Sequence, residues 1–283
     1  MQRISVFFLL TFYISACEQT VGDLDLPDYQ SKIVIDGWIE QGRYAEVTLT
    51  KSASYFADID SAALREALVS TAKVSISDGE NSEVLTLFRN SDKFPPFYYR
   101  GTKMRGEVGK SYKLTVESRG ETYEAVTSIL PPPKLDSLWV EIDTENDSTA
   151  NLWLSFKDEP VVENYYRIFT QRQGKDKKFE AIYLSAIGDR YFDGENFTFN
   201  ILRNTQGIPD SNEAQFSIGD TVMVRFCSID QAHFDFWRTL EREAISIGNP
   251  FSSSGNEILS NTGENALGVW GGYGASYYRI IVK

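Results

Sequence analysis

The feature that most constrains the fold of this 283-residue chain is a repeated alternation of apolar and polar residues over short segments. In residues 112–117, YKLTVE, every second side chain is apolar, and residues 33–39, 47–50 and 73–76 show the same pattern. A period of two is typical of strands with one buried face and one face in water. The chain is therefore predicted to be mainly β.

Turn-forming residues separate these segments and group them into a first domain, residues 31–130. Residues 118–121, SRGE, predict a hairpin turn between two strand-like runs. Short strands joined by tight turns over about 100 residues favour an immunoglobulin-like β-sandwich. A short helix is expected within residues 58–70, with Asp60 and Ser61 as candidates for its N-cap.

Three consecutive prolines at residues 131–133 predict a linker, because proline cannot donate to a sheet and favours a stiff, extended chain. Residues 134–283 are expected to form a second β-domain that resembles a fibronectin type III sandwich, so that two such domains follow in tandem. One helix over about residues 231–246 interrupts it, with Asp230 as its expected N-cap. Its expected apolar face consists of Trp237, Leu240 and Ala244.

The first 16 residues have the features of a secretory signal. Arg3 precedes an apolar run over residues 4–14 that is too short to span a bilayer comfortably, since spanning needs about 20 residues. The ending ISAC, with Cys17 last, resembles a bacterial lipobox. That resemblance implies cleavage before Cys17 and acylation of its sulfur and new amino group. The alternative is an ordinary signal peptide with a cysteine at the cleavage site. Residues 17–30 are expected to be a polar, acidic tether.

The net charge of −12 limits the partners of the chain. Nucleic acid is excluded, because binding to phosphates requires patches of Lys and Arg. A lipid on Cys17 would provide membrane attachment instead. Cys227, the second of two cysteines, would then have no disulfide partner. It lies in a strand-like run with no base nearby, which favours a buried structural thiol over a nucleophile.

Catalytic signatures are scarce in the sequence. His233 is the one histidine, so any Ser-His-Asp or Cys-His mechanism would have to use it. It falls in the first turn of the expected helix, beside no nucleophile motif such as G-x-S-x-G, and the usual zinc-ligand spacings are absent. The sequence therefore predicts a protein that is not an enzyme and has no cofactor. A carboxylate pair of the kind that glycosidases use stays open as an alternative.

The best metal candidate is the loop over residues 188–196, GDRYFDGEN. Asp189, Asp193 and Glu195 offer the oxygen ligands that calcium prefers. A calcium-binding EF-hand loop needs ligands at alternating positions, and three other residues in the middle of this loop break that rhythm. A β-turn is therefore favoured over a metal site.

Aromatic residues give the candidate binding positions. Trp139 and Trp153 lie opposite the aliphatic face of two successive predicted strands, so both are expected to point outward. They could pack against the other domain or the late helix, form a partner interface, or form a platform for a small ligand. Trp270 and Tyr273, in a glycine- and aromatic-rich segment, are a second candidate contact surface. That segment could equally be a loop that leads into a last strand over residues 277–282.

Seven segments from across the chain resemble, in this order, a Bacteroidetes lipoprotein family described as domain of unknown function 4249. They are DLDLP at 23–27, KIVIDGWI at 32–39, VTLTKS at 47–52, NYYR at 164–167, DRYFDG at 189–194, NPFS at 249–252 and LGVWGGY at 267–273. One departure is the serine run at residues 252–254, which replaces an expected proline. The resemblance brings no catalytic residues. It implies a role beside a TonB-dependent transporter, because members are often encoded next to one.

The expected function is that of a non-catalytic outer-membrane lipoprotein, an accessory or ligand-capture subunit of a TonB-dependent transporter. The expected location is the cell surface, or the periplasmic face of the outer membrane. A stand-alone lipoprotein that binds a glycan or a peptide is the first alternative. A carboxylate-dependent hydrolase is the second.

Overall fold

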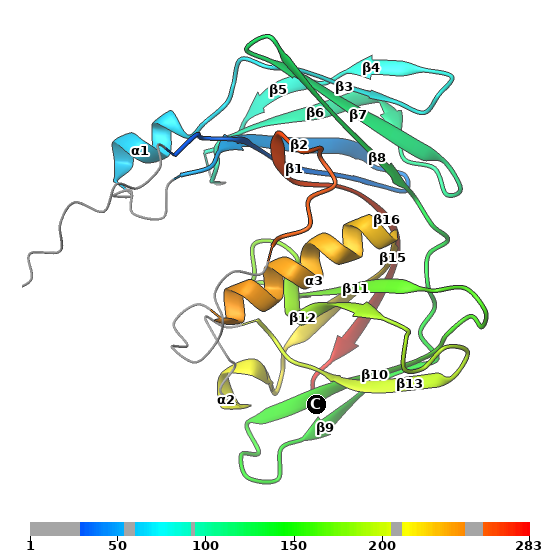
Figure 1. The fold of residues 1–283 in the computed structure, drawn as a ribbon. Coiled ribbons are helices and arrows are strands. Elements are labelled where there is room, and N and C mark those ends of the chain that lie inside the picture. Colours follow the sequence, from blue (N-terminus) through cyan, green and yellow to red (C-terminus); the bar gives the residue numbers. More distant parts are fainter. Residues whose placement is uncertain (1–28, 54–59, 92–93, 205–210, 247–256) are drawn as a thin grey trace, which may run out of the picture. The chain divides into compact units, whose positions relative to one another are not determined.

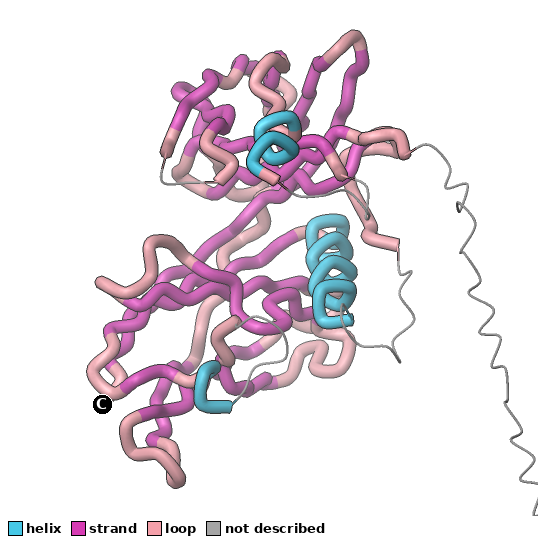
Figure 2. The backbone as a smooth tube through the Cα atoms, turned by 90° about the vertical axis from the view of Figure 1, so that its left-hand side faces the viewer, coloured by secondary structure: helices cyan, strands magenta, loops and turns pink. Residues whose placement is uncertain are grey.

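The computed structural model describes residues 29–53, 60–91, 94–204, 211–246 and 257–283. Strands dominate this part of the chain (Figure 2), so the prediction of a mainly β protein is confirmed. Residues 31–283 form one compact unit. Among the described residues, no helix has both the length and the apolar character that a membrane crossing requires. The expected signal segment and Cys17 lie outside the described residues.

Eight strands form the largest sheet (Figure 1). In spatial order they are β12 (Glu180–Gly188), β11 (Tyr165–Arg172), β15 (Thr221–Ile229), β16 (Ala266–Ile281), β1 (Ile33–Glu40), β2 (Tyr44–Lys51), β6 (Phe97–Arg105) and β5 (Thr86–Arg89). Neighbouring strands run antiparallel, except that β1 and β16 run parallel. The sheet thus combines strands from both ends of the chain.

Two four-stranded sheets complete the β-structure of the described residues. One has the order β4 (Ser82–Val84), β3 (Lys73–Ser77), β7 (Ser111–Ser118) and β8 (Glu121–Ser128). The other has the order β13 (Asn196–Ile201), β10 (Thr149–Lys157) and β14 (Phe216–Ser217), with β9 (Ser137–Ile142) paired to β10. The hairpin predicted at residues 118–121 is confirmed, because it joins β7 to β8 with Ser118 opposite Glu121.

Each small sheet packs through an apolar core against a part of the large one. Ile35 of β1 and Leu114 of β7 belong to the first core, and Leu152 of β10 and Phe226 of β15 belong to the second. All four side chains are at most 1% exposed. Burial of apolar area at about 25 cal/mol per Å² makes such cores the main stabilising term of the fold. The immunoglobulin-like and fibronectin-like assignments stay predictions.

The last strand, β16, connects the two halves of the chain. The three prolines at residues 131–133 lie between β8 and β9, where a linker was expected. However, β16 begins at Ala266, pairs first with β1 from Ile33 onward, and then pairs with β15. This part of the second predicted domain therefore completes the sheet of the first. The strand expected over residues 277–282 is only the end of β16.

Glycines in β16 let other parts of the chain cross it at short range. A Cβ on Gly274 would lie 1.9 Å from the carbonyl oxygen of Leu130, and a Cβ on Gly271 would lie 2.1 Å from the ring of His233. No side chain fits at such distances, so glycine is required at both positions. Both close approaches take place inside the protein.

The described part of the chain contains three helices, α1 (Ser61–Glu66), α2 (Ser211–Ala214) and α3 (Gln231–Ser246). The predicted N-cap Asp60 accepts hydrogen bonds from the N–H groups of Ala62 and Ala63 at 2.9 and 2.7 Å. Capping bonds of this kind satisfy donors that the first turn leaves unpaired. The prediction of this helix and of its cap is confirmed, with α1 shorter than the expected segment.

Helix α3 has the predicted bounds, and its predicted N-cap Asp230 accepts a hydrogen bond from the N–H of His233 at 2.9 Å. The predicted apolar face is partly wrong. His233 and Phe236 are the buried residues of α3, whereas Ala244 is exposed. The reason is that α3 packs on β12, β16 and β11 (Figure 1), and their positions determine which side of the helix is covered.

Candidate functional site

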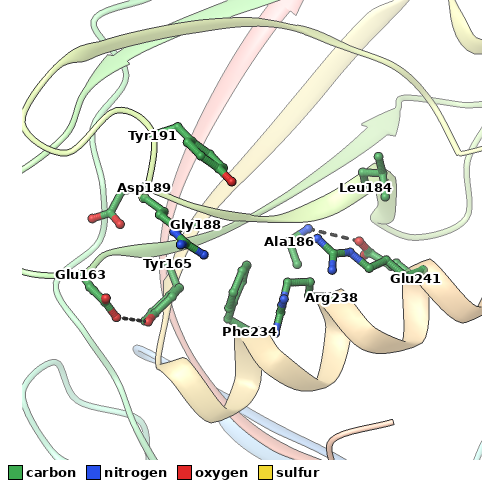
Figure 3. Close-up of a pocket in the computed structure, with 12 residues that line it drawn as sticks. Glu163, Tyr165, Leu184, Ala186, Gly188, Asp189, Tyr191, Phe234, Arg238 and Glu241 are labelled. Carbon is green, nitrogen blue, oxygen red and sulfur yellow. Dashed lines mark hydrogen bonds between the residues drawn. The ribbon is translucent and has the colours of Figure 1, made fainter. Parts of the chain in front are cut away.

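A recess of about 440 Å³ opens between α3 and the strands β11 and β12 (Figure 3). Its lining comes from four segments: the start of β11, the second half of β12, the loop that follows β12, and one side of α3. Pockets that hold small ligands usually have volumes of roughly 300–1,000 Å³. The recess is therefore large enough for a small molecule.

An aromatic pair forms one wall of the recess. The rings of Tyr165 and Phe234 stack with their centroids 4.6 Å apart (Figure 3). The Tyr165 hydroxyl donates to the Glu163 carboxylate at 2.6 Å. Desolvation, together with this bond to a carboxylate, raises the pKa of Tyr165 to about 12. Gly188 leaves space for the pair, since a Cβ there would lie 3.2 Å from the Phe234 ring. The wall is thus fixed in place and neutral at physiological pH.

Glu241 on α3 is hydrogen-bonded to the adjacent strand. Its carboxylate accepts hydrogen bonds from the Ser185 hydroxyl and from the Ala186 N–H, the latter at 3.3 Å. Ser185 in turn accepts a bond from Nε of Arg167 at 3.0 Å, deeper in the protein. Desolvation raises the pKa of the Glu241 carboxyl above its usual value. Glu241 therefore fastens α3 to β12.

The arginines of the recess differ in their pairing. Arg238 forms an ion pair with Asp235 at 3.0 Å, one helical turn away. Arg190 and Arg242 are exposed at the recess, and within the described chain neither forms an ion pair with an acidic side chain. A guanidinium binds carboxylate or phosphate through two parallel hydrogen bonds. The recess thus offers two available guanidinium groups beside an apolar aromatic wall.

His233 is inaccessible to any substrate. Its side chain is 1% exposed, and its ring packs edge-on against Tyr273 with the centroids 4.7 Å apart. The ring also lies over Gly271, where a Cβ would collide with it. Desolvation by burial lowers the pKa of His233 well below its usual value. The histidine is therefore part of the contact between α3 and β16.

Burial of His233 predicts a loss of stability in acid. Because its pKa is lowered in the folded state, the imidazole is neutral in both states above pH ~6.5. Below that pH the unfolded chain takes up a proton that the folded protein excludes, so the free energy of unfolding falls by about 1.4 kcal/mol per pH unit. By NMR, the His233 imidazole signal of the folded protein is expected to keep its position between pH ~8 and ~5.5. A titration with a midpoint near 6.5 would contradict this placement of the ring.

Three carboxylates gather next to the recess. Asp158, Asp189 and Asp193 each bring one oxygen within 4.8 Å of the others. The sequence predicted Asp189 and Asp193 as weak metal candidates. Glu195, the third predicted candidate, is not part of the cluster. Its place is taken by Asp158, from the loop after β10. Desolvation raises the pKa of the Asp189 carboxyl. Oxygens at this spacing are of the type that binds hard cations.

Existing hydrogen bonds explain the cluster without a cation. Asp158 accepts bonds from the Tyr166 hydroxyl at 2.6 Å and from the Gly194 N–H at 3.0 Å. Asp189 accepts from the Asn164 N–H at 2.6 Å, and Asp193 accepts from the Val161 N–H at 3.0 Å. Residues 190–194 form turns, as the preferred interpretation of this loop predicted. The carboxylates thus hold two loops together at the edge of the recess.

Trp139 and Trp153 form a stacked pair on neighbouring strands. They face each other across β9 and β10, with ring centroids 6.2 Å apart and ring planes 13° apart. Both are half-buried, and the Trp139 indole N–H donates to Glu141 at 3.0 Å. Leu152 and Leu154, on the opposite face of β10, are fully buried. Helix α3 packs on β11, β12 and β16, away from this pair.

Trp270 and Tyr273 lie in the interior, not on a surface. Trp270 is fully buried in the first core, and its indole N–H donates to the carbonyl of Tyr112 at 2.9 Å. Tyr273 is 5% exposed, and its hydroxyl accepts a bond from Arg167 at 2.7 Å. Residues 269–275 are therefore a buried strand segment. They do not offer the contact surface that their glycine and aromatic content suggested.

Sequence reasoning missed the main residues of the recess. The sequence analysis names none of Tyr165, Phe234 and Arg190 as a candidate site residue. No local signal links these residues, because they meet only when α3 packs on β11 and β12.

Comparisons with known proteins place the chain in a family. No curated protein matches it. A family model described as "Domain of unknown function (DUF4249)" matches residues 20–279. This span includes the recess and nearly all of the three sheets, and it agrees with the family that the ordered sequence segments resemble. The chain therefore belongs to the DUF4249 family.

Proposed function

We propose that this protein is a non-catalytic, lipid-anchored binding subunit that captures a small anionic ligand beside a TonB-dependent outer-membrane transporter. The observation that carries the proposal is the recess between α3 and β12. There, Arg190 and Arg242 have no acidic partner within the described chain, and the Tyr165–Phe234 pair offers an apolar surface. A ligand with a carboxylate or phosphate and an apolar part fits this chemistry.

The groups that could act as a general base are buried or hydrogen-bonded within the protein, which supports binding rather than catalysis. The chain's one histidine, His233, is buried against Tyr273. Glu241 is hydrogen-bonded to β12, and Asp189 to the backbone of Asn164. A general base must reach the proton that it abstracts, and these groups already serve the protein's own structure. Arg190 and Arg242, by contrast, are exposed at the recess and form no ion pair within the described chain.

The membrane part of the proposal is supported by the sequence around Cys17 and by the family. Acylation at Cys17 would hold the protein at the membrane, where more than one acyl chain gives a stable anchor. Confinement beside a partner raises the effective concentration, so weak contacts with a transporter suffice. Docking at the barrel would place the recess where a captured ligand can be passed on.

Removal of both exposed arginines is expected to weaken ligand capture strongly. The test compares wild-type protein with the Arg190→Ala, Arg242→Ala double variant by thermal shift, using succinate, citrate, inorganic phosphate and a tripeptide with a free carboxylate as probes. A ligand that binds only the folded state raises Tm with concentration. At least one probe is expected to raise Tm in wild type. Its affinity is expected to fall about 100-fold in the double variant, since a hydrogen bond to a charged group contributes roughly 1.5–3 kcal/mol.

The matched control is the Arg65→Ala, Arg279→Ala double variant, which removes the same charge at exposed positions on α1 and β16. It is expected to bind the probe as wild type does. An equal loss of affinity for the probe in both double variants would show that net charge, and not the recess, attracts the ligand. No shift with any of the probes in wild type would count against an anionic ligand.

A further inference from the structure

A second hollow, of about 1040 Å³, lies on the large sheet and is separate from the recess. Its floor is the face of β1 and β2 that carries Asp36, Trp38 and Thr48, opposite the buried Ile35 and Val47. Asn90, Phe94 and Pro95, which lie between β5 and β6, form one wall, and residues of the connection between β11 and β12 form the other. We call this hollow the groove.

Aromatic rings line the groove at three points. Trp38 on the floor is half-buried, Tyr98 on β6 stacks on Phe88 at 5.9 Å, and Phe94 on the wall is 68% exposed. A single exposed aromatic ring is common on protein surfaces, whereas several rings that line one hollow commonly mark a binding surface. The groove therefore has flat apolar faces that a ligand can cover.

The polar groups of the groove include both acceptors and donors of hydrogen bonds. Asp36 on the floor is partly exposed, with protein around the rest of its side chain, while Lys177 and Lys178 lie on the facing wall. Desolvation by the surrounding protein raises the pKa of Asp36, and the nearby charges of Arg167 and Lys178 offset part of that rise. Among the described residues, the lining carries four acidic and three basic side chains. This balance gives no marked preference for an anion or a cation.

The backbone of the floor is not available to a ligand. β1 pairs with β16 on one side and β2 on the other, and β2 pairs with β1 and β6. An extended peptide binds to a sheet mainly by adding a strand to a free edge, and the floor of the groove has none. Recognition in the groove must therefore come from side chains.

We infer that the groove binds a neutral oligosaccharide. A sugar ring has an apolar C–H face that packs on an aromatic ring, and its hydroxyl groups need both acceptors and donors. Phe94, Trp38 and Tyr98 supply the rings, while Asp36 accepts and Lys178 donates. The volume accommodates several sugar units, since it reaches the upper end of typical ligand pockets, roughly 1,000 Å³. This site is independent of the proposed anionic ligand, because it shares no lining residue with the recess.

The test uses the tagged, full-length protein in detergent on an array of neutral glucan, mannan, xylan and galactan oligosaccharides. The best-retained oligosaccharide is then titrated by calorimetry. Wild type is expected to bind, and the Asp36→Asn, Phe94→Ala double variant is expected to bind at least about tenfold more weakly, because it loses a charged acceptor and a stacked ring. Both side chains are accessible to solvent, so the fold is expected to be retained, which circular dichroism checks.

The matched control is the Asp147→Asn, Val126→Ala double variant, which makes similar changes at exposed positions outside the groove. It is expected to bind as wild type does, and so is the Arg190→Ala, Arg242→Ala variant of the recess. Absence of binding to every oligosaccharide, or equal binding by the groove variant, would overturn the inference. The inference would also be overturned if the groove bound members of a peptide library and none of the oligosaccharides. Loss of glycan binding in the recess variant would show that the two sites are not separate.

Discussion

Replacement of Glu40 with alanine is expected to destabilise the protein by about 3–5 kcal/mol. Glu40 is 2% exposed, and its Oε2 lies 2.5 Å from Nη2 of Arg225, whose side chain is only 12% exposed. Glu40 also accepts a hydrogen bond from the Tyr277 hydroxyl at 2.5 Å. Removal of the carboxylate leaves the charge of Arg225 buried without its acidic partner, which is far more costly than the loss of an exposed pair. Urea unfolding of the purified protein measures the difference.

The control for this prediction is an exposed ion pair. Lys73 and Glu117 approach to 2.6 Å, but their side chains are 57% and 47% exposed. Because water screens such pairs, Glu117→Ala is expected to change the free energy of unfolding by no more than about 1 kcal/mol. Similar losses for Glu40→Ala and Glu117→Ala would show that the buried carboxylate does not stabilise the junction of β1, β15 and β16.

Replacement of Gly274 with alanine is expected to destabilise the protein by about 3 kcal/mol or more. The new Cβ would lie 1.9 Å from the backbone oxygen of Leu130 and 3.2 Å from the carbonyl carbon of Pro131. A backbone segment cannot relieve a steric clash by a change of rotamer, as a flexible side chain can. The chain between β8 and β9 would have to move away from β16, and packing on both sides would be lost. Thermal and urea unfolding report the change.

Gly120→Ala separates this collision from the ordinary effect of losing a glycine. Gly120 has a φ of 84° and open space around its Cβ position. Alanine at this position is strained only by the positive φ, so Gly120→Ala is expected to lower the free energy of unfolding by about 1 kcal/mol. If Gly274→Ala cost no more than Gly120→Ala, the close crossing of β16 by residues 130–131 would be contradicted.

The sequence predicts those parts of the fold that local chemistry determines. Asp230 and the residues after it predict α3 with the observed bounds, because capping and helical periodicity act within a few residues. The hairpin turn at residues 118–121 is predicted from equally local signals, namely turn residues between two runs with period-two alternation. By contrast, the first half of β16 has no clear alternation. It becomes a strand by pairing with β1, from the other end of the chain.

Burial of Trp270 shows why the candidate contact residues were harder to predict. Glycine-rich segments are typical of loops, so the sequence favoured a surface position. Here the glycines lead to burial instead, because they let α3 and residues 130–131 approach β16 and cover it. The recess could not be predicted either, because Tyr165 and Phe234 come from distant segments that tertiary packing brings together. The approach of Asp189 to Asp193 was predictable, because both lie in one short loop.

The measurement that tests the proposed function most directly is affinity purification of the tagged protein from gently solubilised native membranes after crosslinking in cells. The Cys17→Ser variant serves as the control for lipid anchoring and is expected to leave the membrane fraction. The proposal predicts that a TonB-dependent barrel is recovered with the wild-type protein in near-stoichiometric amount. Recovery of the protein alone from the crosslinked membranes would contradict a role as a transporter subunit.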